Sequence, residues 1–319
     1  MTKTVIVGSG VVGQATGKGL MKKGNEVVFV DTNIATVEKL NREGFEAHLP
    51  SEMNDLSAEI FMFCISTPPR DDGSVNLEYI VNAVITQGKW LSHKKKDAWP
   101  LLVIRSTVPI GTTRNLLLPL LEKYSGLKVG KDFGLCMQPE FLRAQSNEED
   151  FLHPWVTVIG QYDQRSGDVL EKMYTAFESK IFRVDLEVAE FQKYVHNCFN
   201  ATKISFSNEM WLLGAKIGID ANLALEIMAS TAEGSWNQGY GTIGGRPYGG
   251  TCLPKDTKGL LTFAQERYGI DMPLLSAVIS INSEMEELAK QGVVPSTTIA
   301  GLKWQPSPGL RRKQKEAGR

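Results

Sequence analysis

The first half of the chain alternates short apolar runs with longer stretches in which apolar residues recur at helical spacing. Runs of this length, bounded by glycine, proline and small polar residues, are typical of strands buried on both faces of a parallel sheet. Each run is followed by enough residues for one helix. We therefore expect a doubly wound α/β sheet with strands at Thr4–Val7, Val27–Val30, Ile60–Ile65, Leu101–Ile104 and Phe133–Met137.

The second half has a different pattern. From Val188 to about Gly218 the apolar residues keep a helical period, with no proline and no glycine before Gly214. This pattern predicts one helix of roughly 25–30 residues. Further helices are expected at 221–230, 256–268 and 273–290. The chain thus divides into an α/β domain at 1–185, an all-α domain at 186–290 and a remainder at 291–319.

Composition excludes several classes of protein. Of the 319 residues 42% are hydrophobic and the formal net charge is -1, which predicts globular domains and argues against nucleic acid as the partner. The four cysteines have no paired spacing, so we expect neither a disulfide framework nor a metal site, and a reducing cytoplasm as the location. No apolar run approaches the ~18–20 residues that would cross a membrane.

A glycine-rich turn follows the first expected strand. Gly8, Gly10 and Gly13 form a GxGxxG pattern, and Asp31 closes the second strand. This order and spacing predict a Rossmann-type dinucleotide site: a tight turn at Gly8, close approach of a pyrophosphate at Gly10, and close helix–strand packing at Gly13. Asp31 would bind both ribose hydroxyls and repel a 2′-phosphate, so we expect NAD. The helix start contributes Val11 and Val12 to the same site.

Three later strands also end in small polar or acidic residues. The segments are Ser66-Thr67, Ser106-Thr107 and Gln138-Pro139-Glu140. Ligands bind outside the carboxyl ends of strands in open α/β sheets, so these loops are expected to line one cleft, with Ser66, Thr67 and Thr107 beside the cofactor. The alternative is ordinary turn chemistry, which is common for such residues.

Chemistry of a second kind is indicated in the all-α half. Cys252 follows the turn Gly249-Gly250, with Asp256 four residues later, where a helix is expected to begin. A helix N-terminus favours a thiolate, so Cys252 is a candidate nucleophile, the alternative being a buried cysteine beside a turn. Lys193 and Asn197 lie one helical turn apart and could stabilise an oxyanion together. A solvated lysine is the alternative there.

Taken together, these motifs resemble the nucleotide-sugar 6-dehydrogenases, the UDP-glucose and GDP-mannose dehydrogenases. The resemblance covers approximately residues 1–290 and rests on GSGVVG, STVPIGTT, PEFLR, KYVHNCFNATKISFSNE and GGTCLPKD, in that order. It implies two Rossmann-like domains joined by a helical region, and homodimerisation through the long helix. It also implies oxidation of a sugar's carbon 6 alcohol to a carboxylate with two NAD. UDP-glucose is the expected substrate on its frequency in the family, and GDP-mannose is the alternative.

The resemblance also implies roles for individual residues. Cys252 would form a thiohemiacetal and then a thioester, with Lys193 and Asn197 stabilising the developing oxyanion. Asp256 would orient a water or assist proton transfer, and Thr107 and Glu140 would hold the hydrolytic water, with Glu140 as the base. Lys203 lies on the same helix but does not match the family's catalytic lysine. The expected substrate-binding residues are Phe141, Leu142, Arg143, Lys193, Asn197, Tyr248, Gly249 and Gly250.

The sequence departs from the family pattern in three places. Ala144 replaces a second glutamate found in many members, which should slow the reaction without abolishing it. An arginine expected near the cysteine is absent from its usual place, and Arg246 is a candidate substitute. Thr298–Trp304 matches the first strand of a second Rossmann-like domain and is followed only by a basic tail, so that domain is expected to be truncated.

Two other functions stay open. One is a catalytically silent NAD-binding relative that only assembles with other subunits. The other is a two-electron dehydrogenase of the 6-phosphogluconate or hydroxyacid type, which shares the layout but has no need of a nucleophilic thiol. The motif around Cys252 argues against this second alternative.

Overall fold

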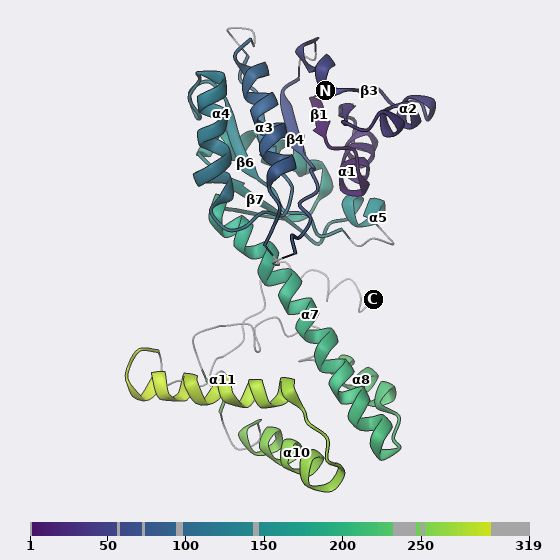
Figure 1. Cartoon of the computed structure of the whole chain (residues 1–319), viewed down its shortest axis with the longest axis vertical. Coiled ribbons are helices and arrows are strands. Elements are labelled where there is room, and N and C mark those ends of the chain that lie inside the picture. Colours follow the sequence, from purple (N-terminus) through teal and green to yellow (C-terminus); the bar gives the residue numbers. More distant parts are fainter. Residues whose placement is uncertain are drawn as a thin grey trace, which may run out of the picture. The chain divides into compact units, whose positions relative to one another are not determined.

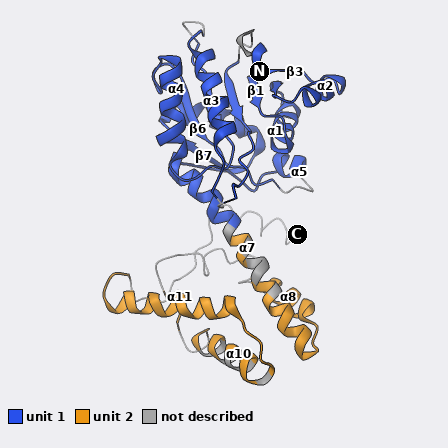
Figure 2. Ribbon diagram, in the orientation of Figure 1, with its two compact units in different colours: residues 1–197 blue, residues 198–319 orange. Residues whose placement is uncertain are grey.

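The computed structural model describes residues 2–55, 58–71, 74–93, 98–142, 147–231, 247–249 and 253–294. The order of helices and strands along these residues can be followed in Figure 1. The chain forms two compact units, Met1–Asn197 and Cys198–Arg319, coloured separately in Figure 2. The division between the compact units falls inside one long helix. The domain boundary at 185/186, expected from the sequence pattern, stays a prediction.

The first unit is built on one sheet. Its eight described strands have the order β3-β2-β1-β4-β5-β6-β7-β8, and all neighbours are parallel except β6 and β7. The order of the first six is that of a doubly wound dinucleotide-binding sheet. The strands are β1 (Lys3–Val7), β2 (Glu26–Val30), β3 (Ala47–His48), β4 (Ile60–Phe63), β5 (Leu101–Ile104), β6 (Gly134–Met137), β7 (Val156–Gln161) and β8 (Lys180–Asp185).

Helices cover both faces of this sheet because its strands are apolar on both sides. Along β4, Phe61 and Phe63 point to one face and Ile60 and Met62 to the other, in two separate core clusters. The helices of this unit before the long one are α1 (Val11–Lys22), α2 (Ile34–Arg42), α3 (Glu78–Leu91), α4 (Leu118–Ser125), α5 (Asn147–Leu152) and α6 (Gln164–Tyr174). Short 3₁₀ turns lie at Pro50–Asp55 and Thr175–Phe177, and a π turn at Thr113–Leu117.

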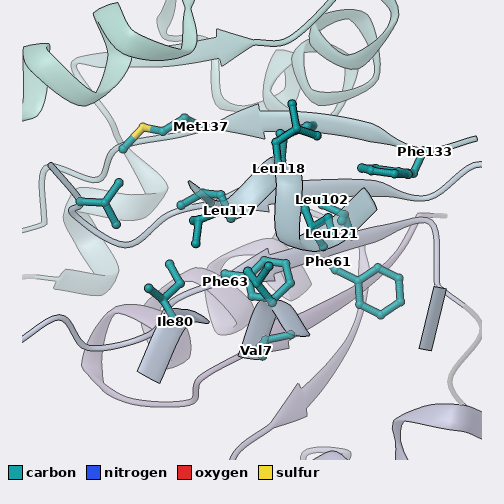
Figure 3. Packing of buried hydrophobic residues seen from close by; sticks show 14 of the residues in the cluster. Val7, Phe61, Phe63, Ile80, Leu102, Leu117, Leu118, Leu121, Phe133 and Met137 are labelled. Carbon is teal, nitrogen blue, oxygen red and sulfur yellow. The ribbon is translucent and has the colours of Figure 1, made fainter. Parts of the chain in front are cut away.

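One of the two clusters lies between the sheet and helices α3 and α4. Figure 3 shows Phe61 and Phe63 of the sheet in this cluster, with Ile80 of α3 and Leu121 of α4 among their neighbours. All four side chains are fully buried. The opposite cluster is formed with α1, α2, α5 and α6, and includes Leu20, Leu40, Phe151 and Leu170. Burial on both sides fixes the carboxyl ends of β1, β4, β5 and β6 along one edge of the sheet.

The long helix α7 (Leu186–Ile217) has 32 residues, and a long helix in this region was predicted. Its first turns belong to the core of the first unit, where Leu186 and Ala189 are fully buried. The carboxylate of Glu190 accepts hydrogen bonds from the backbone N–H groups of Gly111 (2.5 Å) and Thr113 (2.8 Å). These contacts fix the start of α7 against the loop after β5.

The second unit is helical in the part that the structure describes. After α7 it contains α8 (Ala221–Ala229), α10 (Leu253–Tyr268) and α11 (Pro273–Lys290), around a small core that includes Leu213 and Leu275. Glu209 accepts hydrogen bonds from the backbone N–H groups of Leu274 (2.7 Å) and Leu275 (3.1 Å) and so caps α11. Among the described helices, none combines the length and the apolar character needed to cross a membrane.

Candidate active site

A cavity of about 680 Å³ lies along the carboxyl ends of the strands in the first unit. The glycine turn, the end of β2 and the loops after β4, β5 and β6 all contribute to its wall. Its lining consists of Val7, Gly8, Gly10, Val11, Val12, Val30, Asp31, Thr32, Pro50, Cys64, Ile65, Ser66, Thr67, Tyr79, Asn82, Ala83, Thr86, Arg105, Ser106, Thr107 and Glu140. The three polar loops singled out in the sequence therefore meet in one place.

The glycine turn leaves room for a ligand at this cavity. Gly8 has φ +93°, which only glycine adopts readily, and a Cβ on Gly13 would lie 2.0 Å from the carbonyl oxygen of Gly8. A Cβ on Gly10 would meet no atom within 4 Å, so the missing side chain leaves open space at the cavity wall. Helix α1 begins there without a side-chain cap, and its first N–H groups suit a phosphate.

Asp31 is held against this turn by hydrogen bonds. Its Oδ2 accepts a hydrogen bond from the backbone N–H of Ser9 (2.7 Å), and its Oδ1 accepts one from that of Asn33 (2.8 Å). Each carboxylate oxygen keeps a further lone pair, as pairing with a ribose diol requires. The glycine turn and Asp31 together fit a dinucleotide without a 2′-phosphate.

Hydrogen bonds join the loops after β4 and β5. Ser106 Oγ accepts from the backbone N–H of Ile65 (2.9 Å), and Thr67 Oγ1 donates to the carbonyl oxygen of Thr107 (2.7 Å). Ser66 is exposed at the cavity wall, and Thr107 is half-buried. The two loops therefore form a connected polar wall. Their residues make hydrogen bonds between the loops, as turn residues often do, and they also line the cavity.

Glu140 and Lys193, 53 residues apart in sequence, form a partly buried ion pair. Lys193 Nζ lies 2.9 Å from Glu140 Oε1 and also donates to the carbonyl oxygen of Glu140. Lys193 is 5% exposed, and its ammonium lies 5.5 Å from the centre of the Phe141 ring. Glu140 Oε2 accepts from the backbone N–H of Leu142 (2.6 Å). Because Glu140 also lines the cavity, the pair joins α7 to the dinucleotide site.

Other predicted site residues are placed only in part. Asn197 is exposed, one turn beyond Lys193 on α7. The backbone N–H of Tyr248 donates to Asn282 Oδ1 of α11 (2.7 Å), and Gly249 follows it. Helix α10 begins at Leu253 and contains Asp256, whose side chain lies outside the described residues, as does that of Lys203. Also outside the described residues are Arg143, Ala144, Arg246, Gly250 and Cys252.

Sequence reasoning assigned no role to Arg105 or to Cys64. Arg105 follows β5, is 4% exposed, and donates through Nε to Thr16 Oγ1 (3.0 Å) and through a terminal nitrogen to Gln138 Oε1 (2.6 Å). Burial raises the pKa of the Cys64 thiol to about 11, an effect that the positive charge of Arg105 opposes. A basic residue directly after a fully apolar strand was the available signal for Arg105.

Comparison with known proteins gives two matched regions of the chain. The profile of the UDP-glucose/GDP-mannose dehydrogenase family matches residues 2–178 with its NAD binding domain and residues 187–284 with its central domain. GDP-mannose 6-dehydrogenase of Pseudomonas syringae pv. tomato is 32% identical over 304 residues, covering 89% of this chain and 68% of that protein. UDP-glucose 6-dehydrogenase YwqF of Bacillus subtilis is 30% identical over 331 residues, covering 95% and 72%.

Solved structures show the same relationship. A ternary complex of GDP-mannose dehydrogenase from Pseudomonas aeruginosa has a TM-score of 0.83 and 29% identity, covering 91% of this chain and 70% of that one. A UDP-glucose dehydrogenase from Pyrobaculum islandicum has a TM-score of 0.67 and 30% identity, with the same coverage. The chain therefore belongs to the UDP-glucose/GDP-mannose dehydrogenase family, and its cofactor is NAD.

Proposed function

We propose that this protein oxidises the carbon 6 alcohol of a nucleotide sugar to a carboxylate with two NAD per sugar. The observation that carries the proposal is the partly buried pair of Glu140 and Lys193 at the wall of the dinucleotide cavity. Hydrolysis of a thioester formed by oxidation requires a general base to activate water and a cation to stabilise the oxyanion, both beside the redox cofactor. The thiol at Cys252 supplies the nucleophile in this proposal.

The cofactor has a fitting site in the first unit. The turn from Gly8 to Gly13 and the N-terminus of α1 would hold its pyrophosphate, and Asp31 a ribose. When bound, NAD accepts a hydride from the carbon being oxidised in each of the two oxidations. The loops at Thr67 and Thr107 form one wall of the cavity.

The protein's own groups divide the remaining work. The Cys252 thiolate adds to the carbonyl carbon of the aldehyde, giving a tetrahedral carbon that keeps its hydrogen, and its second oxidation leaves a thioester. Glu140 removes a proton from a water whose oxygen attacks the acyl carbon. The carbon–sulfur bond then breaks and the carboxylate is released. One water and two NAD are consumed for each sugar.

Lys193 has one donor left for this chemistry. An ammonium carries three N–H groups. Among the described residues, two of those of Lys193 have acceptors, both belonging to Glu140. The third N–H can donate to a substrate oxygen, where the charge of the ammonium stabilises a developing oxyanion. Glu140 thereby orients the cation while serving as the base.

The substrate is a sugar linked to a nucleoside diphosphate. The frequency of UDP-glucose as a substrate in the family favoured UDP-glucose. The comparisons, however, include a GDP-mannose dehydrogenase structure with a TM-score of 0.83 and a GDP-mannose 6-dehydrogenase with 32% identity. We infer that GDP-mannose is the first substrate to test, with UDP-glucose assayed beside it. The exposed apolar residues of α7 further support a homodimer, as expected from the family.

The test is the NADH formed per limiting nucleotide sugar at saturating NAD. Two NADH per sugar are expected, and Cys252→Ala should form no acid. Glu140→Gln keeps the shape of the side chain but not the base, so a burst of two NADH per site should leave an acylated Cys252 peptide in mass spectra. Full acid production by Cys252→Ala would overturn the mechanism. No NADH with either sugar, with NAD bound in calorimetry, would favour a silent NAD-binding relative.

A further inference from the structure

Arg105 places a buried positive charge in the wall of the cofactor cavity. The residue follows β5, lines the cavity and is only 4% exposed. Its guanidinium passes between Thr16 of α1 and Gln138 after β6, and it stands 5.4 Å from the centre of the Phe151 ring. The side chain is thus fixed by three elements of the first unit.

None of these partners carries a compensating charge. Within the described residues, no carboxylate forms an ion pair with Arg105, whereas Arg114 and Arg183 both have such pairs. Buried charges are normally paired, because removing an ion from water is costly. Of the other charged residues at the cavity, Glu140 is neutralised by Lys193, and Asp31 is held by two backbone N–H groups. Arg105 is therefore a positive charge without a carboxylate partner among the described residues, and the negative charge of Asp31 belongs to the end of β2.

The field of this charge reaches neighbouring groups. Burial raises the pKa values of both Cys64 and Tyr174, and the positive charge of Arg105 opposes that rise in each. Cys64 also lines the cavity. A ligand in this part of the cavity would experience the same positive potential.

The position of Arg105 in the sheet tells which part of the cofactor it faces. A doubly wound sheet consists of two mononucleotide-binding halves, β1 to β3 and β4 to β6. Asp31, at the end of β2, belongs to the first half, and both Arg105 and Gln138 belong to the second. The second half receives the nicotinamide nucleotide when the first binds the adenosine ribose.

We propose that Arg105 is a specificity-determining residue that favours the reduced over the oxidised nicotinamide. The oxidised ring carries a positive charge that reduction removes, so a nearby cation destabilises the oxidised form relative to the reduced one. The two forms share the adenosine and the pyrophosphate, so only groups near the nicotinamide distinguish them. Arg105 thereby makes the transfer of a hydride from the substrate to the bound cofactor more favourable than the same transfer in water.

The test compares the dissociation constants of NAD and NADH, measured by calorimetry on the full chain without substrate. Arg105→Met keeps the aliphatic packing and removes the charge. The ratio of the NAD to the NADH dissociation constant should then fall about fivefold or more. Arg105→Lys should retain most of the ratio. An unchanged ratio in a folded Arg105→Met protein would overturn the proposal, even if both affinities fell together.

Two further variants separate charge from structure. Gln138→Met removes a hydrogen bond of Arg105 and leaves its charge, so the ratio should persist even where absolute affinities decrease. Arg114→Met removes a guanidinium that is paired with Glu187 outside the cavity lining, and should leave the ratio unchanged. If Arg105→Met does not fold, Arg105→Gln provides the neutral variant, with the same fall in ratio expected.

Discussion

At the scale of single residues, the cavity wall contains a thiol that the proposed chemistry does not use. Cys64 is buried, and burial raises its pKa to about 11, with the positive charge of Arg105 acting in the opposite direction. A raised pKa means that the neutral thiol predominates throughout the neutral range. Cys64 is therefore an inert wall residue, in contrast to the role proposed for Cys252.

This difference predicts selective alkylation. With iodoacetamide at pH 8, Cys64 should remain unmodified while the protein is folded, because both its burial and its protonation oppose attack. Cys136, whose pKa burial also raises, should behave likewise and serves as the internal control. Peptide mass spectrometry before and after unfolding measures the modified fractions. Rapid labelling of Cys64 in the folded protein at pH 8 would show that its thiol is not held neutral.

Single residues also show how far sequence reasoning reached. Glu140 and Lys193 were both named from the resemblance, and the structure brings them within 2.9 Å of each other. Arg105 directly precedes one of the quoted motifs but was given no role, because its significance depends on burial and on partners from α1 and from the loop after β6. A sequence pattern shows a charge, but it does not show whether a counter-charge lies nearby.

At the scale of elements, α7 exposes an apolar stripe. Val188, Phe191, Val195 and Phe199 are between 48% and 55% exposed and follow one another at intervals of three or four residues. Side chains at these intervals share one face of a helix. A stripe of this kind is typical of a surface covered by another subunit, and a second copy of this chain is the proposed occupant.

Charge on this stripe should separate the subunits. The double variant Phe191→Glu and Val195→Glu should be a monomer in light scattering after size-exclusion chromatography, and the unchanged chain should be a dimer. The variant should stay folded as a monomer, since both positions are exposed within a single chain. Ile34→Glu on α2 is the matched control, because Ile34 is 60% exposed on another helix. Dimers that persist in the double variant would exclude this face.

Helix α11 holds the segment that precedes the cysteine motif. Asn282 is 7% exposed, accepts from the backbone N–H of Tyr248 (2.7 Å) and donates to Glu286 Oε1 (3.0 Å). The backbone at Tyr248 is thereby fixed four residues before Cys252. On the proposed function, this anchor contributes to placing the nucleophile.

A polarity swap tests the anchor. Asn282→Asp keeps the acceptor for Tyr248 but puts a second carboxylate against Glu286, so kcat should fall about tenfold, as expected for a partly buried like-charge contact. Adding Glu286→Gln reverses the donor and the acceptor and should restore kcat. NAD affinity, a property of the first unit, should be unchanged in both proteins. Ser283→Ala, on the exposed side of α11, is the control. A double variant as slow as the single one would refute the anchor.

The elements that were predicted differ physically from those that were not. Strands β4 and β5 are continuous apolar runs buried along their whole length, and α11 has the predicted bounds of Pro273–Lys290. β3 has two residues, and β8 has no buried residue, as its place at the sheet edge allows. β7 was also missed; α5 and α6 flank it in sequence, but it pairs antiparallel to β6, whereas the prediction assumed a parallel sheet.

At the scale of the whole molecule, the order of strands fixes where the cofactor site must be. β1 and β4 are neighbours although two strands and two helices separate them in sequence. The chain reverses direction of winding between them, and ligands bind at such a switch point. The glycine turn after β1 and the polar loop after β4 both lie there, which is why residues from separate segments line one cavity.

The start of α7 gives a prediction about fragments. A fragment ending at residue 185 loses Leu186 and Ala189 from the core and leaves the N–H groups of Gly111 and Thr113 without the Glu190 carboxylate. Its free energy of unfolding in urea should be at least about 3 kcal/mol below that of a fragment ending at residue 197. Glu190→Ala in the full chain should destabilise in the same direction. Equal stability of the two fragments would contradict this view.

The family profiles divide near residue 187, whereas the compact units divide after Asn197. The first turns of α7 thus match the profile of the central domain but pack in the core of the first unit. Lys193 is the residue for which this matters, since it belongs by ancestry to the central domain and by contact to the NAD-binding domain. Exchange of either domain between relatives would therefore take Glu140 from one protein and Lys193 from another. The two domains are thus expected to be inherited together.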